Sequence, residues 1–177
     1  MTNWQVRRGV LADAPALARI NVAAWRGAYA GIVPADYLAA MDVADRIEKW
    51  QAYLVHPAPS ATFVAVDEQD AIGAYCNVGA LRTEDGTGEP GAGELRSIYA
   101  DPAHQGSGAG RIVHDAALEY LAELGYERAG LWVFEGNKRT RAWYEARGWA
   151  PDGQTHLDEL AGRVIPELRY SRRLTNG

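Results

Sequence analysis

Residues 105–110 read Gln105-Gly106-Ser107-Gly108-Ala109-Gly110, and this glycine-rich turn sets the architecture around it. Its alternating glycines expose consecutive backbone N–H groups, which suits the binding of a phosphate. A β-like segment, residues 94–100, precedes the turn, and a helix is predicted from about Gly110 to Leu124. A bound anion would then lie at the positive end of that helix.

Two familiar phosphate-binding motifs do not match this turn. The Walker loop requires Gly-Lys-Ser/Thr after four spacer residues, whereas Gly110 is followed by Arg111 and Ile112. The dinucleotide fingerprint requires a third glycine three positions after the second, where this sequence has Arg111. The pattern that remains is Gln-x-x-Gly-x-Gly.

A second motif follows one strand and one helix after the turn. Together the two motifs resemble the signatures of the GCN5-related N-acetyltransferase (GNAT) superfamily. The second signature consists of an Asn, an aromatic-Tyr pair, and a Gly followed by an aromatic residue. Here it runs from Asn137 through Trp143-Tyr144 to Gly148-Trp149. Two signatures in the right order are much harder to obtain by chance than either alone. The resemblance covers residues 4–172 in element order and is specific from about Glu94 to Trp149.

The element order predicts an α/β (α+β) fold with a mixed, mostly antiparallel central sheet and about four flanking helices. Residues 62–66 and 72–81 have the pattern of a hairpin. Strand–helix–strand–helix order from 94 to 148 indicates neighbouring strands joined by a crossover. The resemblance implies that the strands near 94–100 and 130–135 splay apart and that the cofactor lies in the cleft between them.

The segment 82–93 and the C-terminal strands carry no motif, so their composition alone supports the predictions for them. Residues 82–93 are polar and glycine-rich, so they predict a mobile loop, either a lid or, as we favour, a plain long hairpin loop. Tail strands are expected at about 154–160 and 163–172. Pro166 interrupts the last of them, which predicts a bulge or an edge position. Tail strands in the resembling family sometimes build dimers, so a homodimer is an open alternative.

Size and composition predict a single domain, residues 1–177, because 177 residues with 47% apolar content can bury an adequate core. A lone cysteine, Cys76, excludes an intramolecular disulfide and is expected to be a buried small hydrophobe. The sequence has no membrane-length apolar run and no signal core, which predicts a cytoplasmic enzyme without a membrane partner. A net charge of −5 argues against nucleic acid, and the four histidines lack ligand spacing, so no metal is expected.

The resemblance implies acetyl-CoA as co-substrate and assigns residues to it. Main-chain groups of Ile98 and Tyr99 would meet the pantetheine arm and the thioester oxygen. Asn137 would hydrogen-bond the pantetheine, cap its own helix, or do both. Arg139 would help to hold an anionic cofactor, or would belong to a solvated helix face. The pyrophosphate is expected at the turn, which comprises Gln105, Gly106, Ser107, Gly108, Ala109, Gly110 and Arg111.

Acetyl transfer to an amine requires a neutral amine and a proton for the departing thiolate. A lysine-like amine has a pKa of about 10.4, and thiol and tyrosine have pKa values of about 8.5 and 10, so a base and a tyrosine acid are both useful. The resemblance implies that Tyr144 is the acid; the alternative is a core tyrosine bound to a carbonyl. The resemblance also makes Glu94 the candidate base, acting through water; the alternative is a solvated carboxylate or an ion pair with Arg96.

The acceptor is not encoded in any motif of this sequence. Trp25 and Tyr29 correspond to the family's variable acceptor-side region, so they line the acceptor pocket or belong to the core. The predicted function is transfer of an acetyl group from acetyl-CoA to a primary amine by direct attack, with a small molecule, an antibiotic or a peptide N-terminus as acceptor. The alternative is a CoA-binding sensor or interaction module without turnover.

Overall fold

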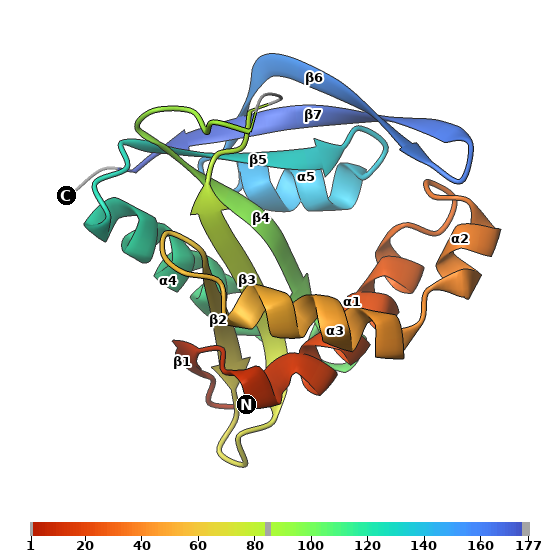
Figure 1. The fold of residues 1–177 in the computed structure, drawn as a ribbon, viewed down its shortest axis with the longest axis vertical. Helices are drawn as coiled ribbons and strands as arrows, with labels where there is room; N and C mark the ends of the chain where they lie inside the picture. Colours follow the sequence, from red (N-terminus) through yellow and green to blue (C-terminus); the bar gives the residue numbers. More distant parts are fainter. Residues whose placement is uncertain (1, 84–85, 175–177) are drawn as a thin grey trace.

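The computed structural model describes residues 2–83 and 86–174, and within them the strands form one twisted sheet (Figure 1). Its order is β1-β2-β3-β4-β5-β7-β6. The β4–β5 pair is parallel and the other neighbouring pairs are antiparallel. The predicted mixed, mostly antiparallel sheet is therefore confirmed. The strands are β1 (Gln5–Arg8), β2 (Ala61–Val66), β3 (Ile72–Ala80), β4 (Ala92–Ala100), β5 (Arg128–Phe134), β6 (Ala150–Leu160) and β7 (Arg163–Arg173).

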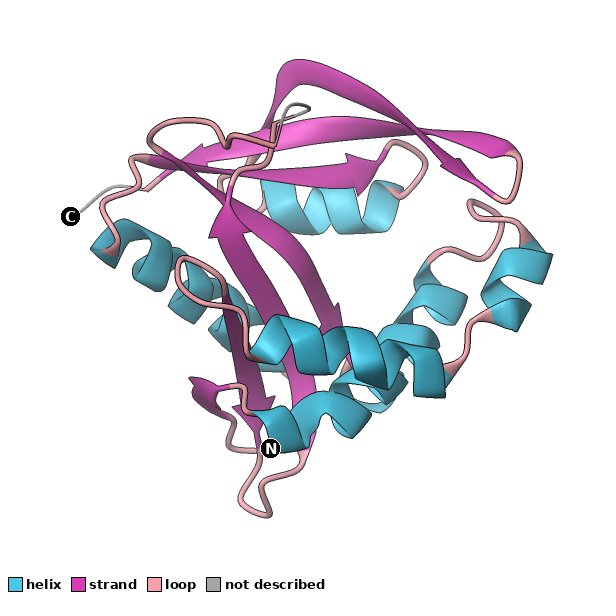
Figure 2. Cartoon of the chain, in the orientation of Figure 1, coloured by secondary structure: helices cyan, strands magenta, loops and turns pink. Residues whose placement is uncertain are grey.

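Helices cover both faces of the sheet (Figure 2). The helices α1 and α3 lie against one face of the β1–β4 half, and α4 lies against the other. The short helix α5 lies under the β5–β7 half. The described residues thus contain five α-helices where about four were expected. They are α1 (Ala14–Ala28), α2 (Ala35–Ala40), α3 (Val43–Leu54), α4 (Ala109–Glu123) and α5 (Lys138–Glu145).

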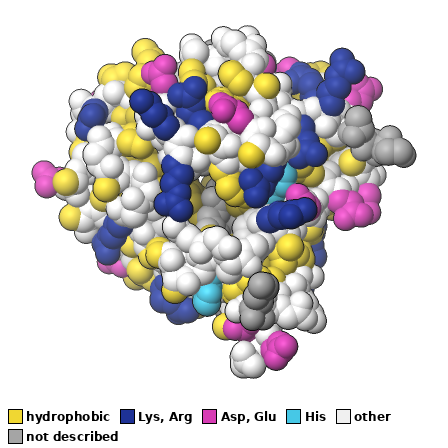
Figure 3. Space-filling model, turned by 180° about the vertical axis from the view of Figure 1, so that it is seen from behind, with side chains coloured by type: hydrophobic (Ala, Val, Ile, Leu, Met, Phe, Trp, Pro, Cys, Tyr) yellow, Lys and Arg dark blue, Asp and Glu magenta, His cyan; other side chains and the backbone are white. Residues whose placement is uncertain are grey.

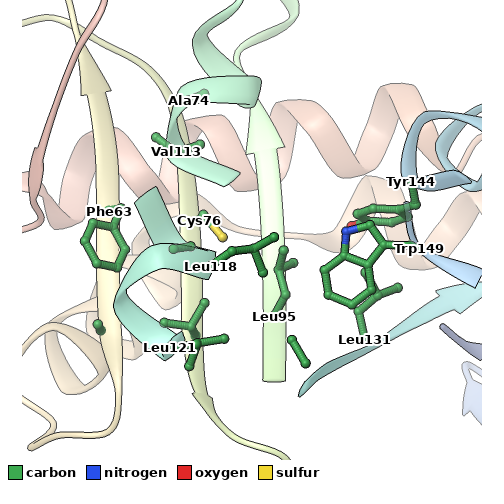
Figure 4. Close-up of a cluster of buried hydrophobic side chains, with 14 of the residues drawn as sticks. Phe63, Ala74, Cys76, Leu95, Val113, Leu118, Leu121, Leu131, Tyr144 and Trp149 are labelled. Carbon is green, nitrogen blue, oxygen red and sulfur yellow. The ribbon is translucent and has the colours of Figure 1, made fainter. Parts of the chain in front are cut away.

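Alternation along the strands divides the core into two layers. On β2, Phe63 packs into the cluster beneath α4, whereas Val64 packs into the cluster beneath α1 and α3, because successive strand residues point to opposite faces. Cys76 on β3 lies in the α4 layer and is buried, as predicted. This layer extends to Tyr144 and Trp149, so one continuous core joins the two halves of the sheet (Figure 4).

The strands β4 and β5 pair over a short distance and then diverge. A register shift against β3 leaves Arg96 as an extra residue in β4, between the pairs Asn77↔Ser97 and Val78↔Leu95. Such a bulge bends and twists the strand that carries it. The predicted splay is therefore confirmed. The parallel pairs are Ala92↔Arg128, Gly93↔Ala129 and Glu94↔Gly130.

The edge or bulge predicted at Pro166 is wrong. Strand β7 lies between β5 and β6, and the register shift in this hairpin falls between Pro151 and Thr155 of β6. The carbonyl of Pro166 accepts a hydrogen bond from the amide of Glu135 at 2.9 Å, just after β5 has ended at Phe134. The nitrogen of Pro166 faces the same side, beyond the β5 ladder, so no strand hydrogen bond requires its missing N–H.

The connection between β3 and β4 is anchored near its end. One oxygen of the Glu89 carboxylate pairs with Arg128 on β5, and the other binds Nη1 of Arg169 on β7 at 2.9 Å. The segment predicted as a loop, 82–93, includes residues 84–85, which lie outside the described residues. A lid role for this loop stays a prediction.

Candidate active site

A cleft of about 1360 Å³ opens where β4 and β5 diverge. Its volume exceeds the roughly 300–1,000 Å³ usual for one small ligand, so two substrates fit side by side. On the face shown in Figure 3 the molecule is hollowed, and Lys and Arg side chains surround the hollow. The walls come from the end of α1, the start of the β3–β4 connection, β4, the glycine turn, β5, α5 and the β6–β7 hairpin.

Most residues predicted from the sequence line this one cleft. Two do not: Ala109 is buried, and Ser107 turns its hydroxyl to the His104 carbonyl at 2.6 Å. The predicted residues that line the cleft are Trp25, Tyr29, Glu94, Ile98, Tyr99, Gln105, Gly106, Gly108, Gly110, Arg111, Asn137, Arg139 and Tyr144.

The glycine turn exposes backbone to the cleft. Gly106 and Gly108 have φ values of +78° and +94°, a region that favours glycine. Gly108 is the N-cap of α4. The Ala109 amide donates to the Ser107 hydroxyl at 3.5 Å and the Arg111 amide donates to the Gly108 carbonyl at 3.0 Å, whereas the amides of Gly106, Gly108 and Gly110 have no acceptor among the described residues. The Ser107 amide already donates to the His104 carbonyl at 3.2 Å. A Cβ atom added at Gly110 would meet no neighbouring atom within 4 Å, so packing does not require glycine there.

Arginines make the part of the cleft next to the glycine turn and α5 electropositive. Arg111, Arg139 and Arg147 all line it. The guanidinium of Arg147 stacks on the Trp143 ring, 3.7 Å from its centroid, and donates to the Trp143 carbonyl at 2.9 Å. Burial lowers the pKa of Arg147, but from a starting value so high that the group stays charged at neutral pH. The bare amides and these cations fit the phosphates of CoA.

Asn137 is the N-cap of α5. Its Oδ1 accepts a hydrogen bond from the Thr140 amide at 3.3 Å, which confirms the predicted capping. The side chain is buried and also lines the cleft. A hydrogen bond from its NH₂ group to the pantetheine arm stays a prediction.

Tyr144 projects from α5 into the core at the wall of the cleft, with 5% of its surface exposed. Its ring lies between Trp143 and Trp149, at centroid distances of 5.4 and 6.0 Å. Burial raises the pKa of its hydroxyl, which therefore stays protonated at neutral pH. Within residues 2–83 and 86–174, no protein group hydrogen-bonds this hydroxyl. The core tyrosine bound to a carbonyl is thus not what the structure contains.

Glu94 is buried, with 2% exposure, and is paired with Arg82. Its Oε1 accepts from Nη2 of Arg82 at 2.7 Å, and its Oε2 accepts from both the amide and Nε of Arg82 at 3.0 Å. The predicted partner Arg96 is wrong. Arg96 belongs to the β4 bulge and instead donates to the Ser60 hydroxyl and the Ala80 carbonyl.

Aromatic rings form the wall of the cleft that α1 contributes. The hydroxyls of Tyr29 and Tyr99 lie 2.7 Å apart in a hydrogen bond. The Tyr29 ring contacts those of Trp25 and Phe134, at centroid distances of 4.8 and 4.9 Å. Burial raises the pKa of both hydroxyls, so both are neutral at physiological pH. Trp25 and Tyr29 are therefore cleft residues and core residues at once.

Sequence reasoning missed the contribution of the hairpin. Trp132 on β5, His156 and Asp158 on β6, and Glu167 on β7 also line the cleft. No motif marks them. The signal that could have found them is the alternation of side chains along paired strands. His156 pairs with Glu167, and Glu167 pairs with Phe134, so these three side chains point to the same face of the sheet.

The described residues offer neither a metal-binding cluster nor a membrane-spanning helix. They hold no group of three or more His, Cys, Asp or Glu side chains placed to bind a metal ion. Among their helices, none has the length and apolar character that crossing a membrane demands.

Solved structures share this fold. The phosphinothricin acetyltransferase (Pat) of Sinorhizobium meliloti, solved with acetyl-CoA, superposes with a TM-score of 0.74 at 21% identity, over 100% of this chain and 91% of that one. The protein yncA of Salmonella typhimurium, solved with its cofactor acetyl-CoA, gives 0.71 at 20% identity, over 99% and 96%. At such identities the likeness concerns the fold.

Sequence comparison identifies the class. The uncharacterized N-acetyltransferase YuaI of Bacillus subtilis (strain 168) is 32% identical over 132 residues, 75% of this chain and 72% of that protein. Together with the split sheet and the glycine turn, this defines the class of the protein as an acetyltransferase. Residues 23–149 match the acetyltransferase (GNAT) family. The chain belongs to that family.

Proposed function

We propose that this enzyme acetylates a primary amine, which attacks acetyl-CoA directly without an acetylated enzyme. The observation that carries the proposal is the Tyr144 hydroxyl, which is protonated, on the cleft, and without a protein hydrogen-bond partner among the described residues. A group of this kind can give its proton to a leaving atom in the cleft. Bound acetyl-CoA supplies the activated acetyl thioester.

The donor side uses the turn and the helix that follows it. The amides around Gly106 and Gly108, together with Arg111 and Arg139, hold the pyrophosphate. Within residues 2–83 and 86–174, the main chain of β4 at Ile98 and Tyr99 has no partner on its β5 side, because the parallel pairing stops at Glu94. Its free N–H and C=O groups are available to the pantetheine arm and the thioester oxygen.

Tyr144 gives its proton to the departing sulfur. A raised tyrosine pKa makes the proton harder to give, but the thiol that receives it enters the same dry region. Burial raises the pKa of Cys76, a thiol in the same core cluster. Burial of the CoA thiol at the cleft wall would raise its pKa in the same direction as that of Tyr144.

The base role of Glu94 stays a prediction, and its contacts favour a structural ion pair, although the partner is Arg82 and not the expected Arg96. Both of its oxygens accept hydrogen bonds from Arg82. In this position Glu94 fixes the Arg82 side chain beside the cleft.

The test is release of free thiol from acetyl-CoA with an acceptor panel. The panel contains spermidine, phenethylamine, an amino acid amide, an aminoglycoside and a short peptide with a free N-terminus. Thiol release that requires one of these amines, with the acetylated amine found by mass spectrometry, is the expected result. Tight acetyl-CoA binding without release would favour the alternative, a CoA-binding sensor. The cytoplasmic location and the homodimer stay predictions.

A further inference from the structure

Glu167 faces the cleft from the hairpin side. It lies on β7 in register with Phe134 of β5 and His156 of β6, and it lines the cleft. Phe134 contacts Tyr29, whose hydroxyl bonds Tyr99 on β4. Glu167 therefore stands across the opening from the strand that carries the thioester in the proposed function.

No group in the described part of the chain holds the carboxylate of Glu167, in contrast to that of Glu94. Among the described residues, no hydrogen bond or ion pair engages the Glu167 side chain, whereas the oxygens of Glu94 are held by Arg82. A base must have a lone pair directed at the proton that it takes. Of these two carboxylates, Glu167 meets that requirement.

Charged groups from two sides act on Glu167. Burial raises its pKa, and Asp158 on β6 and Glu94 on β4 add to the rise, while His156 on β6 and Arg82 oppose it. The net direction is upward, toward the range in which a general base works at neutral pH.

The charge of Glu167 also acts on Tyr99, which lines the same cleft. Burial raises the pKa of the Tyr99 hydroxyl, and the charge of Glu167 contributes to that rise. Tyr99 in turn contributes to the raised pKa of Tyr144. Glu167 and Tyr144 thus each interact electrostatically with Tyr99, and all three residues line one cleft.

We infer that Glu167 binds the acceptor's ammonium group and removes its proton; this rests on the proposed function. The N–H bond breaks, the proton moves to a Glu167 oxygen, and the freed nitrogen lone pair forms the C–N bond to the acetyl carbon. The C–S bond breaks, and the sulfur takes the proton of Tyr144. The nitrogen loses two protons: one passes through Glu167 to water, and the other restores Tyr144.

The experiment compares variants by kcat/KM against pH with the panel amine that the wild type acetylates best. Glu167→Gln should lower kcat/KM for an alkylamine by about 10²- to 10⁴-fold and abolish the acidic limb of the profile, with acetyl-CoA affinity unchanged. An arylamine, already neutral at the assay pH, should lose far less. Glu159→Gln is the matched control, because Glu159 is exposed on the same hairpin and pairs opposite Val164.

A second variant guards against misfolding. Glu167→Ala should regain alkylamine turnover when formate is added, which a structural defect would not do. An acidic limb that survives Glu167→Gln, or one that disappears in Glu94→Gln instead, overturns the assignment. If the wild type releases no thiol with any amine, both proposals fail; if it does and Glu167→Gln behaves like wild type, only this one fails.

Discussion

At the scale of single residues, the hydroxyl of Tyr144 bears most directly on the mechanism. Tyr144→Phe should lower kcat by about 10²- to 10⁴-fold and leave the acetyl-CoA dissociation constant nearly unchanged. The free energy of unfolding should hold or rise, because no described protein group loses a hydrogen bond. Thiol-release kinetics, calorimetric titration and urea unfolding measure the three quantities.

The control for this substitution is Tyr120→Phe. Tyr120 packs on Phe63 and Arg8 away from the cleft, so its loss of a hydroxyl should leave turnover unaltered. Equal turnover in Tyr144→Phe and the wild type would remove Tyr144 from the mechanism.

The Arg82–Glu94 pair should respond unequally to the loss of either partner. The Glu94 side chain is 2% exposed and that of Arg82 is 60% exposed. Arg82→Gln leaves a buried carboxylate without a cation and should cost roughly 3 kcal/mol of stability, whereas Glu94→Gln leaves a guanidinium that can reach water and should cost about 1 kcal/mol. Urea midpoints would rank the two variants, and the reverse order would contradict this account of the pair.

Residues fixed by local pattern were predictable, and those fixed by long-range pairing were not. The glycine turn, the Asn137 cap and the position of Tyr144 follow from spacing within one turn or helix. The partner of Glu94 does not, because Arg82 reaches it across a loop that has no sequence pattern. Glu167 enters the cleft only because β7 inserts between β5 and β6. No sequence motif marks that insertion.

At the scale of elements, a substitution in the first turn of α4 should affect ligand binding without weakening the fold. Gly110 has no protein atom near a Cβ position, and leucine forms helix better than glycine. Gly110→Leu should leave stability unchanged or raise it by up to about 1 kcal/mol. Acetyl-CoA affinity should fall at least about tenfold, which is about 1.4 kcal/mol. The acetyl-CoA affinity of Gly110→Ala should lie between those of the wild type and Gly110→Leu. If Gly110→Leu bound acetyl-CoA as tightly as the wild type, the pyrophosphate would have to bind elsewhere.

Helix α4 also carries a buried histidine that links stability to pH. Trp149 Nε1, a donor only, donates to His114 Nε2 at 3.0 Å, so Nδ1 bears the hydrogen and donates to Asp115 at 2.8 Å. The ring is neutral, and burial lowers its pKa. Its contribution to stability is complete above the unfolded pKa of about 6.5 and is lost as the pH falls toward the lower folded pKa.

His114→Gln should therefore reduce the loss of unfolding free energy that the protein suffers as the pH falls. The wild type should lose more stability than the variant between about pH 7.5 and about pH 5.5. Urea unfolding at both values gives the comparison, in which the contributions of the carboxylates cancel. Equal losses would show that His114 does not titrate in this window.

At the scale of the whole molecule, the two halves of the sheet share three β4–β5 residue pairs, the Glu89 ion pairs and the core beneath α4. A ligand seated in the splay contacts both halves and binds only the folded state. At a hundredfold excess over its Kd, acetyl-CoA should add about 2.7 kcal/mol. For a chain of 177 residues, this corresponds to roughly 5–10 °C in Tm.

A thermal scan with and without acetyl-CoA measures the shift, and hydrogen exchange locates it. Protection should rise at β4 and β5 together. If protection rose only in α4, acetyl-CoA would contact the glycine turn and α4 but would not bridge β4 and β5.

The splay also assigns the two substrates to separate stretches of the chain. In the proposed function the turn before α4 holds the donor, and the β6–β7 hairpin, which begins about forty residues after the turn, lines the far side of the cleft. Mutations in the hairpin can change which amine the protein accepts while the residues that bind the common donor stay the same. Duplicated copies of such a gene can therefore diverge in substrate range through one short segment, without passing through a form that has lost its donor.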